Sequence, residues 1–439
     1  MPGTVILLKN KTLLGLFLAT FFVFSSFTAF FPVLPLHLQQ LGASNLLIGM
    51  IMSAFPVGVL VFRPPVGWFL SHKGRSWTLW MGTVLLLVSS LFYPLARDAM
   101  LLLVVRFFHG LGIAAYTTAS IVLISDVTTF ENRGSVMGYL GVANYLGFGL
   151  GPYLASRLYH TAGINSVFYS AAGLVVFALL SLFLVREPEV PHSAQENETD
   201  VGIREMVRQR FFLVPSLFVL IAALVQGSVV NFLPLYLAAR NPQLEAGTFF
   251  LFFSISVIFI RIVAGKAADR HGRGIVIFFA TLLLISSLIV LSMTASLALL
   301  ILAGMLYGAG YGSQQPTLTA LVADHTTFRT RSTLFSIYYA VFDFGMLLSG
   351  YLLGVLADRA GILQIYPFSV AVYAVGVVVF LTQIQSSLRQ SIRWVFSSRG
   401  SGKICRICYN QIGIDPCHIC GHRGGRRSAL DSAAHRISR

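Results

Sequence analysis

The chain has 439 residues, of which 56% are hydrophobic, 13% are aromatic and only 11% are charged. A soluble globular domain carries about 25% charged residues, so this chain has too few charged side chains to cover its apolar surface in water. The composition excludes a soluble enzyme, a secreted disulfide scaffold and a disordered chain, and it predicts an integral membrane protein.

Twelve apolar stretches are long enough to cross a bilayer, since a membrane-spanning helix needs about 20 mostly apolar residues. Backbone polar groups in lipid must pair within their own segment, and the stretches lack the alternation of barrel strands, so all are predicted as helices. The first is too long for a cleavable signal peptide and lacks a small-residue cleavage site, so it is expected to remain. The predicted helices are 12–37, 46–70, 77–96, 100–125, 135–159, 164–185, 212–238, 246–268, 275–294, 297–323, 332–357 and 363–385.

Basic residues are distributed unequally between the two sides of the predicted membrane. If the N-terminus is inside, the cytoplasmic loops and the C-terminal tail collect most of the Lys and Arg residues. The outer loops contain only Arg97, Arg157, Arg240 and Arg359. This bias predicts a multi-pass protein of the plasma (inner) membrane with both termini in the cytoplasm. Much of the net charge of +15 lies in the tail, and the remainder follows the same bias, so no nucleic-acid partner is expected.

The sequence repeats itself at an offset of 198 residues. Shared hydrophobicity alone would not align charged and glycine positions at one offset. The chain is therefore predicted to form two pseudo-symmetric six-helix halves, 1–185 and 211–385, with a cytoplasmic linker at 186–210 and a basic tail at 386–439. The aligned pairs include Arg63 with Arg261, Gly67 with Gly265, Gly74 with Gly272, Arg75 with Arg273, Gly110 with Gly308, Asp126 with Asp324 and Arg133 with Arg331.

The most specific motif follows the eighth predicted helix and reads Gly265-Lys-Ala-Ala-Asp269-Arg270-His-Gly272-Arg273. Its glycines allow a tight turn, and its carboxylate can accept hydrogen bonds from arginine or from a helix N-terminus. The segment resembles the signature loop of the major facilitator superfamily, and this resemblance extends over about residues 10–385. It implies an all-α membrane fold of twelve transmembrane helices, in which two halves rock about a central solute site.

The resemblance also implies that these loops close the cytoplasmic face and separate when that side opens. Asp269 is then expected to face the loop near Arg133, whereas the first-half copy has Ser71 in place of the acid, which weakens the matching contact to Arg331. A turn that merely carries inside-positive charges is the alternative. The predicted gating residues are Gly67, Gly74, Arg75, Asp126, Arg133, Gly265, Asp269, Arg270, Gly272, Arg273, Asp324 and Arg331.

Asp343 is the one acidic residue in the middle of a predicted spanning helix. An ionised carboxylate there is costly unless it is paired or meets water, so Asp343 is the predicted proton-coupling site. The alternative is a neutral Asp bonded to a neighbouring helix. Arg106 lies in a segment that resembles a second family motif, which implies a part in proton coupling, and His109 lies on nearly the same face. The alternatives are an arginine that reaches the outer surface and a histidine that only packs.

Gly138, Gly147, Gly151 and Pro152 in the fifth predicted helix are spaced as in exporting members of the family, although close helix packing explains them nearly as well. The motif favours efflux by proton antiport. The resemblance implies a cavity lined by predicted helices one, four, seven and ten, with five and eleven beside them. The polar and aromatic side chains of these helices are mostly neutral, which favours a small neutral or amphipathic solute. The candidate cavity residues are Tyr116, Asn144, Gln226, Asn231, Tyr307, Tyr311, Gln314, Gln315, Tyr338 and Tyr339.

All four cysteines lie in the tail, where Cys405, Cys408, Cys417 and Cys420 form two Cys-x2-Cys pairs. Such pairs can hold a structural zinc ion, and a cytoplasmic location argues against disulfides. The segment resembles the four-cysteine zinc module of the bacterial recombination protein RecR. An unstructured tail is the alternative.

Together these features predict a secondary active transporter, not an enzyme, that exports a small solute in exchange for protons by alternating access. We find no phosphate-binding loop in a suitable context, and we expect no cofactor for transport. The expected partners are the lipid bilayer, the solute and protons, and the expected state is a monomer. Two alternatives stay open: a proton-coupled or facilitative importer of a sugar-like or other metabolite, and a non-transporting membrane receptor with a zinc-binding tail.

Overall fold

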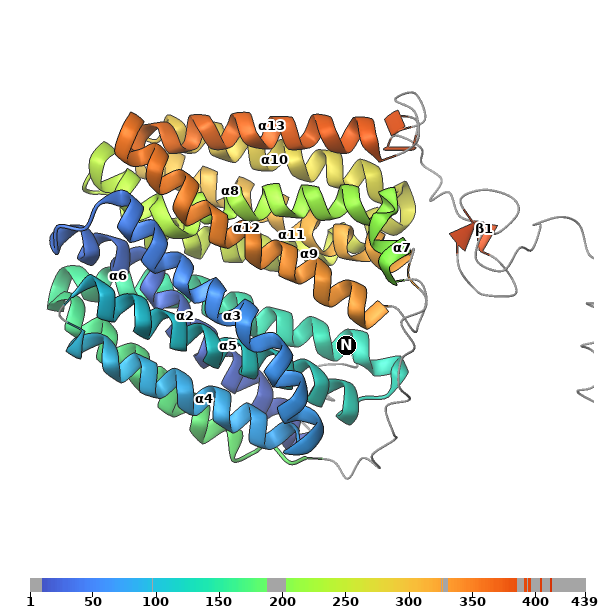
Figure 1. Ribbon diagram of the computed structural model, residues 1–439, viewed down its shortest axis with the longest axis horizontal. Coiled ribbons are helices and arrows are strands. Elements are labelled where there is room, and N and C mark those ends of the chain that lie inside the picture. The colour runs from blue at the N-terminus through green and yellow to red at the C-terminus, as the bar shows by residue number, and fades with distance from the viewer. Residues whose placement is uncertain are drawn as a thin grey trace, which may run out of the picture.

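The computed structural model describes residues 10–96, 98–187, 203–324, 326, 331–384, 391–392, 394–395, 403–404 and 411–412. Long helices make up almost all of the described chain, and they lie in two groups that follow one another in the sequence (Figure 1). The cysteine motif of the tail lies outside the described residues. Two short strands in the tail, β1 (Lys403–Ile404) and β2 (Gln411–Ile412), pair antiparallel.

The first group of helices precedes the linker, and the second group follows it. The first contains α2 (Lys11–Gln40), α3 (Asn45–His72), α4 (Arg75–Phe92) with the short η1 (Tyr93–Leu95), α5 (Ala99–Val127) and α6 (Phe130–Leu182). A short helix, α7 (Ile203–Arg208), ends the linker. The second group contains α8 (Arg210–Arg240), α9 (Ala246–His271), α10 (Arg273–Ser292), α11 (Leu297–Asp324), α12 (Arg331–Ala360), the short η2 (Ile362–Gln364) and α13 (Ile365–Gln383).

Helix α6 contains two of the predicted spans in succession. Gly163 interrupts it with a φ of 78°, a left-handed conformation that glycine adopts without steric cost. Ten described helices are long and apolar enough to cross a membrane, with α6 counted once, and α9 contributes the shorter apolar segment Ala246–Arg261. With α6 divided at Gly163, these helices account for the twelve predicted spans, and the predicted all-helical membrane fold is confirmed.

The bundle has two ends, which the course of the chain distinguishes. Helix α6 ends, and α8 begins, at the end that we call the linker side, which lies on the right in Figure 1. The α2–α3 and α8–α9 turns lie at the opposite end, which we call the far side. Between the two groups, α3 packs against α12 and α6 packs against α9. The offset of 198 residues relates α3 to α9 and α6 to α12, so the two seams between the halves are pseudo-symmetric.

Glycines let helices approach closely at corresponding places in the two halves. Gly110 of α5 lies against the carbonyl of Phe55, and Gly308 of α11 lies against the carbonyl of Phe253. The same offset of 198 relates both members of the two contacts. Small residues at such positions allow backbone-to-backbone packing within the membrane. A further contact of this kind, Gly49 of α3 against Gly350 of α12, joins the two halves.

We expect Gly350→Ala to destabilise the contact between α3 and α12. A Cβ at residue 350 would overlap the carbonyl of Gly49 and the hydroxyl of Ser53, so the helices must move apart. Overpacking of this kind costs about 1–3 kcal/mol, which a lowered thermal unfolding midpoint in detergent would report. Gly67→Ala is the matched control, because no atom lies within 4 Å of a Cβ there. Equal midpoints for the two variants would contradict this packing argument.

Candidate functional site

An ion pair between Arg63 of α3 and Asp343 of α12 joins the two halves. Arg63 Nε donates to Asp343 Oδ2 at 2.9 Å, and Arg63 Nη2 lies 2.9 Å from the same oxygen. The side chain of Asp343 is only 11% exposed, whereas that of Arg63 is 35% exposed. A carboxylate with so little access to water needs a charged partner to remain ionised at low cost. The sequence indicated that Asp343 must be protonated, paired or hydrated, and the structure shows it paired.

A second contact occupies the pseudo-symmetric place. The offset of 198 maps Arg63 onto Arg261 of α9, and it maps Asp343 onto Tyr145 of α6. Arg261 Nη2 donates to the hydroxyl of Tyr145 at 3.1 Å, and its guanidinium lies 4.6 Å from the centroid of the tyrosine ring. Tyr145 therefore takes the place of the carboxylate. Sequence analysis aligned the two arginines but missed this tyrosine, which the same offset would have identified.

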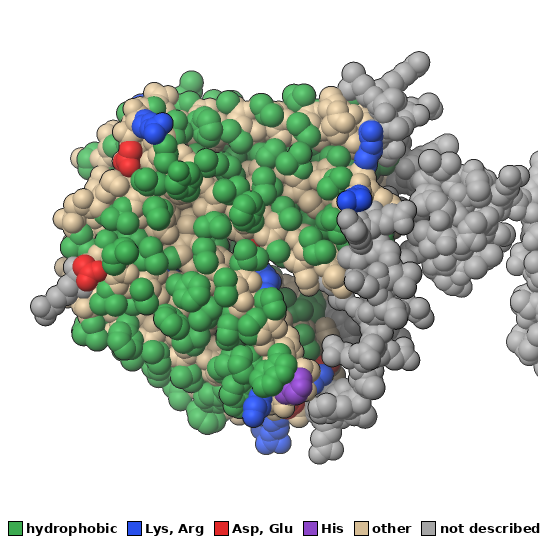
Figure 2. Space-filling view, viewed as in Figure 1, with side chains coloured by type: hydrophobic (Ala, Val, Ile, Leu, Met, Phe, Trp, Pro, Cys, Tyr) green, Lys and Arg blue, Asp and Glu red, His purple; other side chains and the backbone are tan. Residues whose placement is uncertain are grey.

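A cleft opens between the two halves, which these two contacts join. Figure 2 shows the surface hollowed between the two groups of helices toward the linker side. Among the predicted cavity residues, Tyr339 is 37% exposed, and Asn144, Tyr311 and Gln315 are partly exposed. These side chains come from α6, α11 and α12, which belong to both halves.

The remaining predicted cavity residues are buried inside their own half in this conformation. In the first half, Tyr116 shares a hydrogen bond of 2.8 Å with Thr20. Tyr338 is fully buried, and its hydroxyl has no hydrogen-bond partner in the described part of the chain. Hydrogen bonds such as the one between Tyr116 and Thr20 hold neighbouring helices of one half together. The pairs in the second half are Tyr307 with Gln226 at 2.9 Å, Asn231 with Ser349 at 3.2 Å, and Gln314 with Thr281 at 2.8 Å and with Tyr373 at 2.6 Å.

Arg106 is buried in the first half, with 1% of the residue exposed. Its guanidinium faces the rings of Phe30 and Phe55 at 5.9 and 5.1 Å, and Nη2 lies 3.9 Å from the sulfur of Met52. Cation–π contacts of this kind stabilise a desolvated arginine. Among the described residues, no acceptor pairs with Nε or Nη1, and the structure shows no contact between Arg106 and Asp343.

His109 lies one turn after Arg106 on α5 and is also fully buried. Its Nδ1 shares a hydrogen bond of 3.1 Å with the hydroxyl of Tyr93, and its ring meets the edges of nearby phenylalanine rings. No hydrogen-bond partner of Nε2 is found in the described part of the chain. The structure therefore places Arg106 and His109 together inside the first half, and it does not join them to the ion pair of the cleft.

Ion pairs on the linker side follow the repeat. Arg75 lies 2.9 Å from Asp126, and Arg273 lies 2.6 Å from Asp324, so each pair joins residues of one half at the same offset. Gly74 and Gly272 precede these arginines with φ values of 93° and 92°, which only glycine adopts readily. Arg270 is exposed. The side chains of Arg133, Asp269 and Arg331 are not among the described ones, so the contact expected of Asp269 remains a prediction.

Sequence analysis missed a contact between the linker and the first half. The carboxylate of Glu187 accepts hydrogen bonds from the backbone N–H groups of Arg75 at 2.6 Å and Ser76 at 3.2 Å. These groups begin α4, where a negative charge is stabilised by the helix dipole.

The glycines of α6 pack against α2. Gly147 faces the backbone of Phe21 and Ser25, and Gly151 faces Ser25 and Thr28, at distances that leave no space for a side chain. Gly138 has open space around it, and so do Gly67 and Gly265. Close packing within the first half is therefore the visible role of Gly147 and Gly151.

On the far side, the two halves are joined directly through a contact that has no local signal in the sequence. Asp358 of α12 accepts hydrogen bonds from the backbone N–H groups of Asn45 and Leu46 at 2.9 and 3.0 Å, and from Asn45 Nδ2 at 2.9 Å. These groups begin α3, so Asp358 caps a helix of the other half. At the second seam, the backbone N–H of Gly247 donates to Ser156 Oγ at 3.2 Å.

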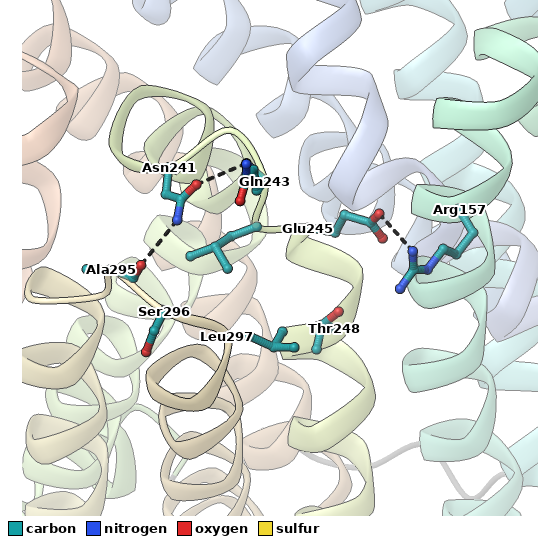
Figure 3. Close-up of a pocket in the computed structure, with 9 residues that line it drawn as sticks. Arg157, Asn241, Gln243, Glu245, Thr248, Ala295, Ser296 and Leu297 are labelled. Carbon is teal, nitrogen blue, oxygen red and sulfur yellow. Dashed lines mark hydrogen bonds and ion pairs between the residues drawn. The ribbon is translucent and has the colours of Figure 1, made fainter.

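A pocket of about 410 Å³ lies on the far side, between α6 and the turns of the second half (Figure 3). Arg157 and Glu245 face each other there at 3.4 Å, while Asn241 bonds to the carbonyl of Ala295. The pocket is separate from the cleft, which opens toward the linker side. Direct contacts thus join the halves on the far side, whereas Figure 2 shows a hollow between them toward the linker side.

The sequence model described as Major Facilitator Superfamily matches residues 16–349 and 241–392. The chain is 27% identical to the multidrug resistance protein MdtG of Salmonella heidelberg over 396 residues, which cover 86% of this chain and 95% of the relative. It is 25% identical over 367 residues to an uncharacterised MFS-type transporter of Methanocaldococcus jannaschii, with 80% and 92% covered.

Two solved structures share the fold. A variant of the nucleoside transporter NupG superposes with a TM-score of 0.70 at 14% identity, covering 84% of this chain and 98% of that one. A bacterial homologue of the human lysosomal transporter Spinster, in an inward-facing and unoccupied conformation, superposes with a TM-score of 0.63 at 16% identity, covering 88% and 93%.

We expect Asp358→Ala to favour separation of the halves on the far side. The change removes the acceptor of three hydrogen bonds that join α12 to α3. Because Asp358 is exposed and water competes for these bonds, their contribution is about 1 kcal/mol, so the open population should rise about fivefold. Ser53→Cys supplies the probe, since Ser53 is 2% exposed and bonds to the Leu347 carbonyl across the seam.

The measurement is the rate of maleimide labelling at residue 53, in a chain whose four tail cysteines are replaced by serine. Asp98→Ala is the control, because Asp98 caps α5 within one half through a bond of 2.8 Å to Leu101. Equal labelling rates in the Asp358 and Asp98 variants would show that Asp358 does not hold the far side closed.

Proposed function

Because the chain belongs to the Major Facilitator Superfamily, we propose that it is a proton-coupled secondary transporter that works by alternating access. The ion pair of Arg63 with Asp343 carries this proposal. It places an ionisable carboxylate that is only 11% exposed on one half and its countercharge on the other. A proton at this position therefore acts directly on a contact between the two parts that must move.

The coupling follows from the chemistry of the pair. Ionised Asp343 attracts Arg63 and joins α12 to α3. Protonated Asp343 has no charge, so the attraction is lost and the arginine is free to turn toward water or solute. Proton binding and release then change the relative free energies of the conformations that open to the two sides.

We propose that the linker side is cytoplasmic, since the loops there carry most of the basic residues. The solute would then enter the cleft from the cytoplasm and leave on the far side in exchange for a proton. The similarity to a multidrug resistance protein supports export. The alternative is proton-coupled uptake of a metabolite, which the fold shared with a nucleoside transporter supports.

We expect Asp343→Asn to abolish solute-dependent proton movement, because an amide side chain does not bind and release a proton near neutral pH. The measurement uses inverted membrane vesicles with a pH gradient, a panel of drugs and neutral metabolites, and a pH-sensitive dye. Asp98→Asn is the matched control, since asparagine caps a helix as well as aspartate does. A compound that collapses the gradient equally in the wild type and in Asp343→Asn would rule out Asp343 as the coupling site.

The proposed orientation can be tested by labelling introduced cysteines in a chain without the tail cysteines. Ser296 lies exposed in a far-side turn, and Ser71 lies exposed at the linker-side end of α3. A membrane-impermeant maleimide should label Ser296→Cys in intact cells, and it should label Ser71→Cys only after the membrane is permeabilised. The reverse labelling pattern would show that the linker side faces outward, and the proposed direction of transport would then be wrong.

A further inference from the structure

Arg261 of α9 has no carboxylate partner among the described side chains. The repeat gives each half an arginine at the seam, but Asp343 neutralises Arg63, whereas Tyr145 stands opposite Arg261. The ion pairs of the described side chains involve Arg63, Arg75, Arg157 and Arg273, and none involves Arg261. Arg261 is exposed at the seam between α6 and α9, and the described side chains leave its positive charge uncompensated.

The surroundings of this charge are aromatic and come from both halves. The Tyr145 ring on α6 lies 4.6 Å from the Arg261 guanidinium and 6.3 Å from the ring of Phe253 on α9. The ring of Phe253 in turn lies 5.7 Å from that of Tyr311 on α11. Gly141 lies one turn before Tyr145, and a Cβ there would lie 3.2 Å from Arg261 Nη1. The missing side chain thus leaves room for the guanidinium to lie along α6.

We propose that Arg261 determines which solutes the cleft accepts, and that it favours aromatic solutes with an oxygen acceptor over organic cations. A carboxylate, sulfonate or carbonyl oxygen can take hydrogen bonds from the guanidinium, and a carboxylate can take two in parallel. The tyrosine rings give a flat solute an apolar surface on which to stack. A cationic solute is repelled, because Arg63 and Asp343 cancel and leave only the charge of Arg261.

This inference rests on the proposed function in one respect, namely that the cleft is the solute site. It does not depend on the direction of transport or on Asp343 as the proton site. A purely structural Arg261 would hold α9 to α6 through Tyr145, and its loss would change stability without changing which solutes bind. Ligand discrimination therefore separates the two roles.

The test measures binding to the purified full chain in detergent, without any gradient. The probes share one naphthalene scaffold and carry an anionic, a neutral or a cationic polar group: naphthoate, naphthamide and naphthylmethylammonium. Ligand that binds the folded state raises the thermal unfolding midpoint, and titration gives the dissociation constant. For the wild type we expect naphthoate to bind most tightly, naphthamide less tightly and the cation least.

Arg261→Gln should weaken naphthoate binding about tenfold or more, since a charge-assisted pair is lost, and it should improve binding of the cation. Arg240→Gln is the matched control, because Arg240 ends α8 on the far side, where it bonds to the carbonyl of Thr294. Arg261→Lys keeps the charge without the planar fork, so it should still reject the cation while binding naphthoate less tightly than the wild type.

The proposal is overturned if the wild type prefers the cation, if naphthoate does not bind, or if Arg261→Gln keeps the wild-type order. These outcomes are independent of the vesicle assay. If ligand binding depends on Arg261 while Asp343→Asn still moves protons like the wild type, Asp343 is not the proton site but Arg261 still selects the solute. If Asp343→Asn loses proton coupling while Arg261→Gln keeps the wild-type order of ligands, Asp343 remains the proton site and Arg261 does not select the solute.

Discussion

The ion pair of Arg63 with Asp343 is the interaction on which the functional argument depends. A membrane-spanning helix gains nothing from a charge unless that charge finds a partner or water, because desolvation alone costs several kcal/mol. In this protein, each member of the pair belongs to a different half. The price of burying the charges is therefore offset only while α3 and α12 stay in contact, so the protonation state and the arrangement of the halves are linked.

The internal repeat explains the frame around this pair, and its departures from symmetry explain the chemistry. Equivalent glycine contacts, at Gly110 and Gly308, set the same helix spacing in each half. Equivalent ion pairs, Arg75 with Asp126 and Arg273 with Asp324, stabilise the same linker-side corner. At the seams the symmetry is broken, since a tyrosine faces one arginine and a carboxylate faces the other. Two equal carboxylates would have neutralised both arginines and left no charge for solute selection.

Burial distinguishes a third arginine, Arg106, from the two arginines at the seams. Arg106 has no counterpart at its repeat position, which is Gly304, and it lies among aromatic rings inside one half. It therefore gives no direct contact between the moving parts. Its place beside His109 makes it a feature of the packing of α5 with α2 and α3 in this conformation.

The helices and the repeat could be predicted from the sequence because both leave local or periodic signals. Apolar runs of the right length marked every span, including the two that Gly163 joins within α6. The isolated acid at Asp343 was equally visible, since a charge in an apolar run stands out. The partners were not visible, because Arg63 and Asp343 lie 280 residues apart and meet only when the halves assemble. Tyr145 could have been found from the offset, whereas Asp358 resembles any acid at a helix end.

Two of the polar contacts between α3 and α12 involve a carboxylate, and the surroundings of the two carboxylates differ. Asp358 is exposed at the end of α12, so water competes for its hydrogen bonds, and the contact is weak enough to form and break as the far side opens. Asp343 lies 15 residues earlier, about 22 Å along the helix, where little water reaches it. Because the Coulomb energy of an ion pair rises as the surroundings become less polar, a proton changes the free energy of the buried contact far more than that of the exposed one. The exposed acid therefore suits a gate, and the buried acid suits a coupling site.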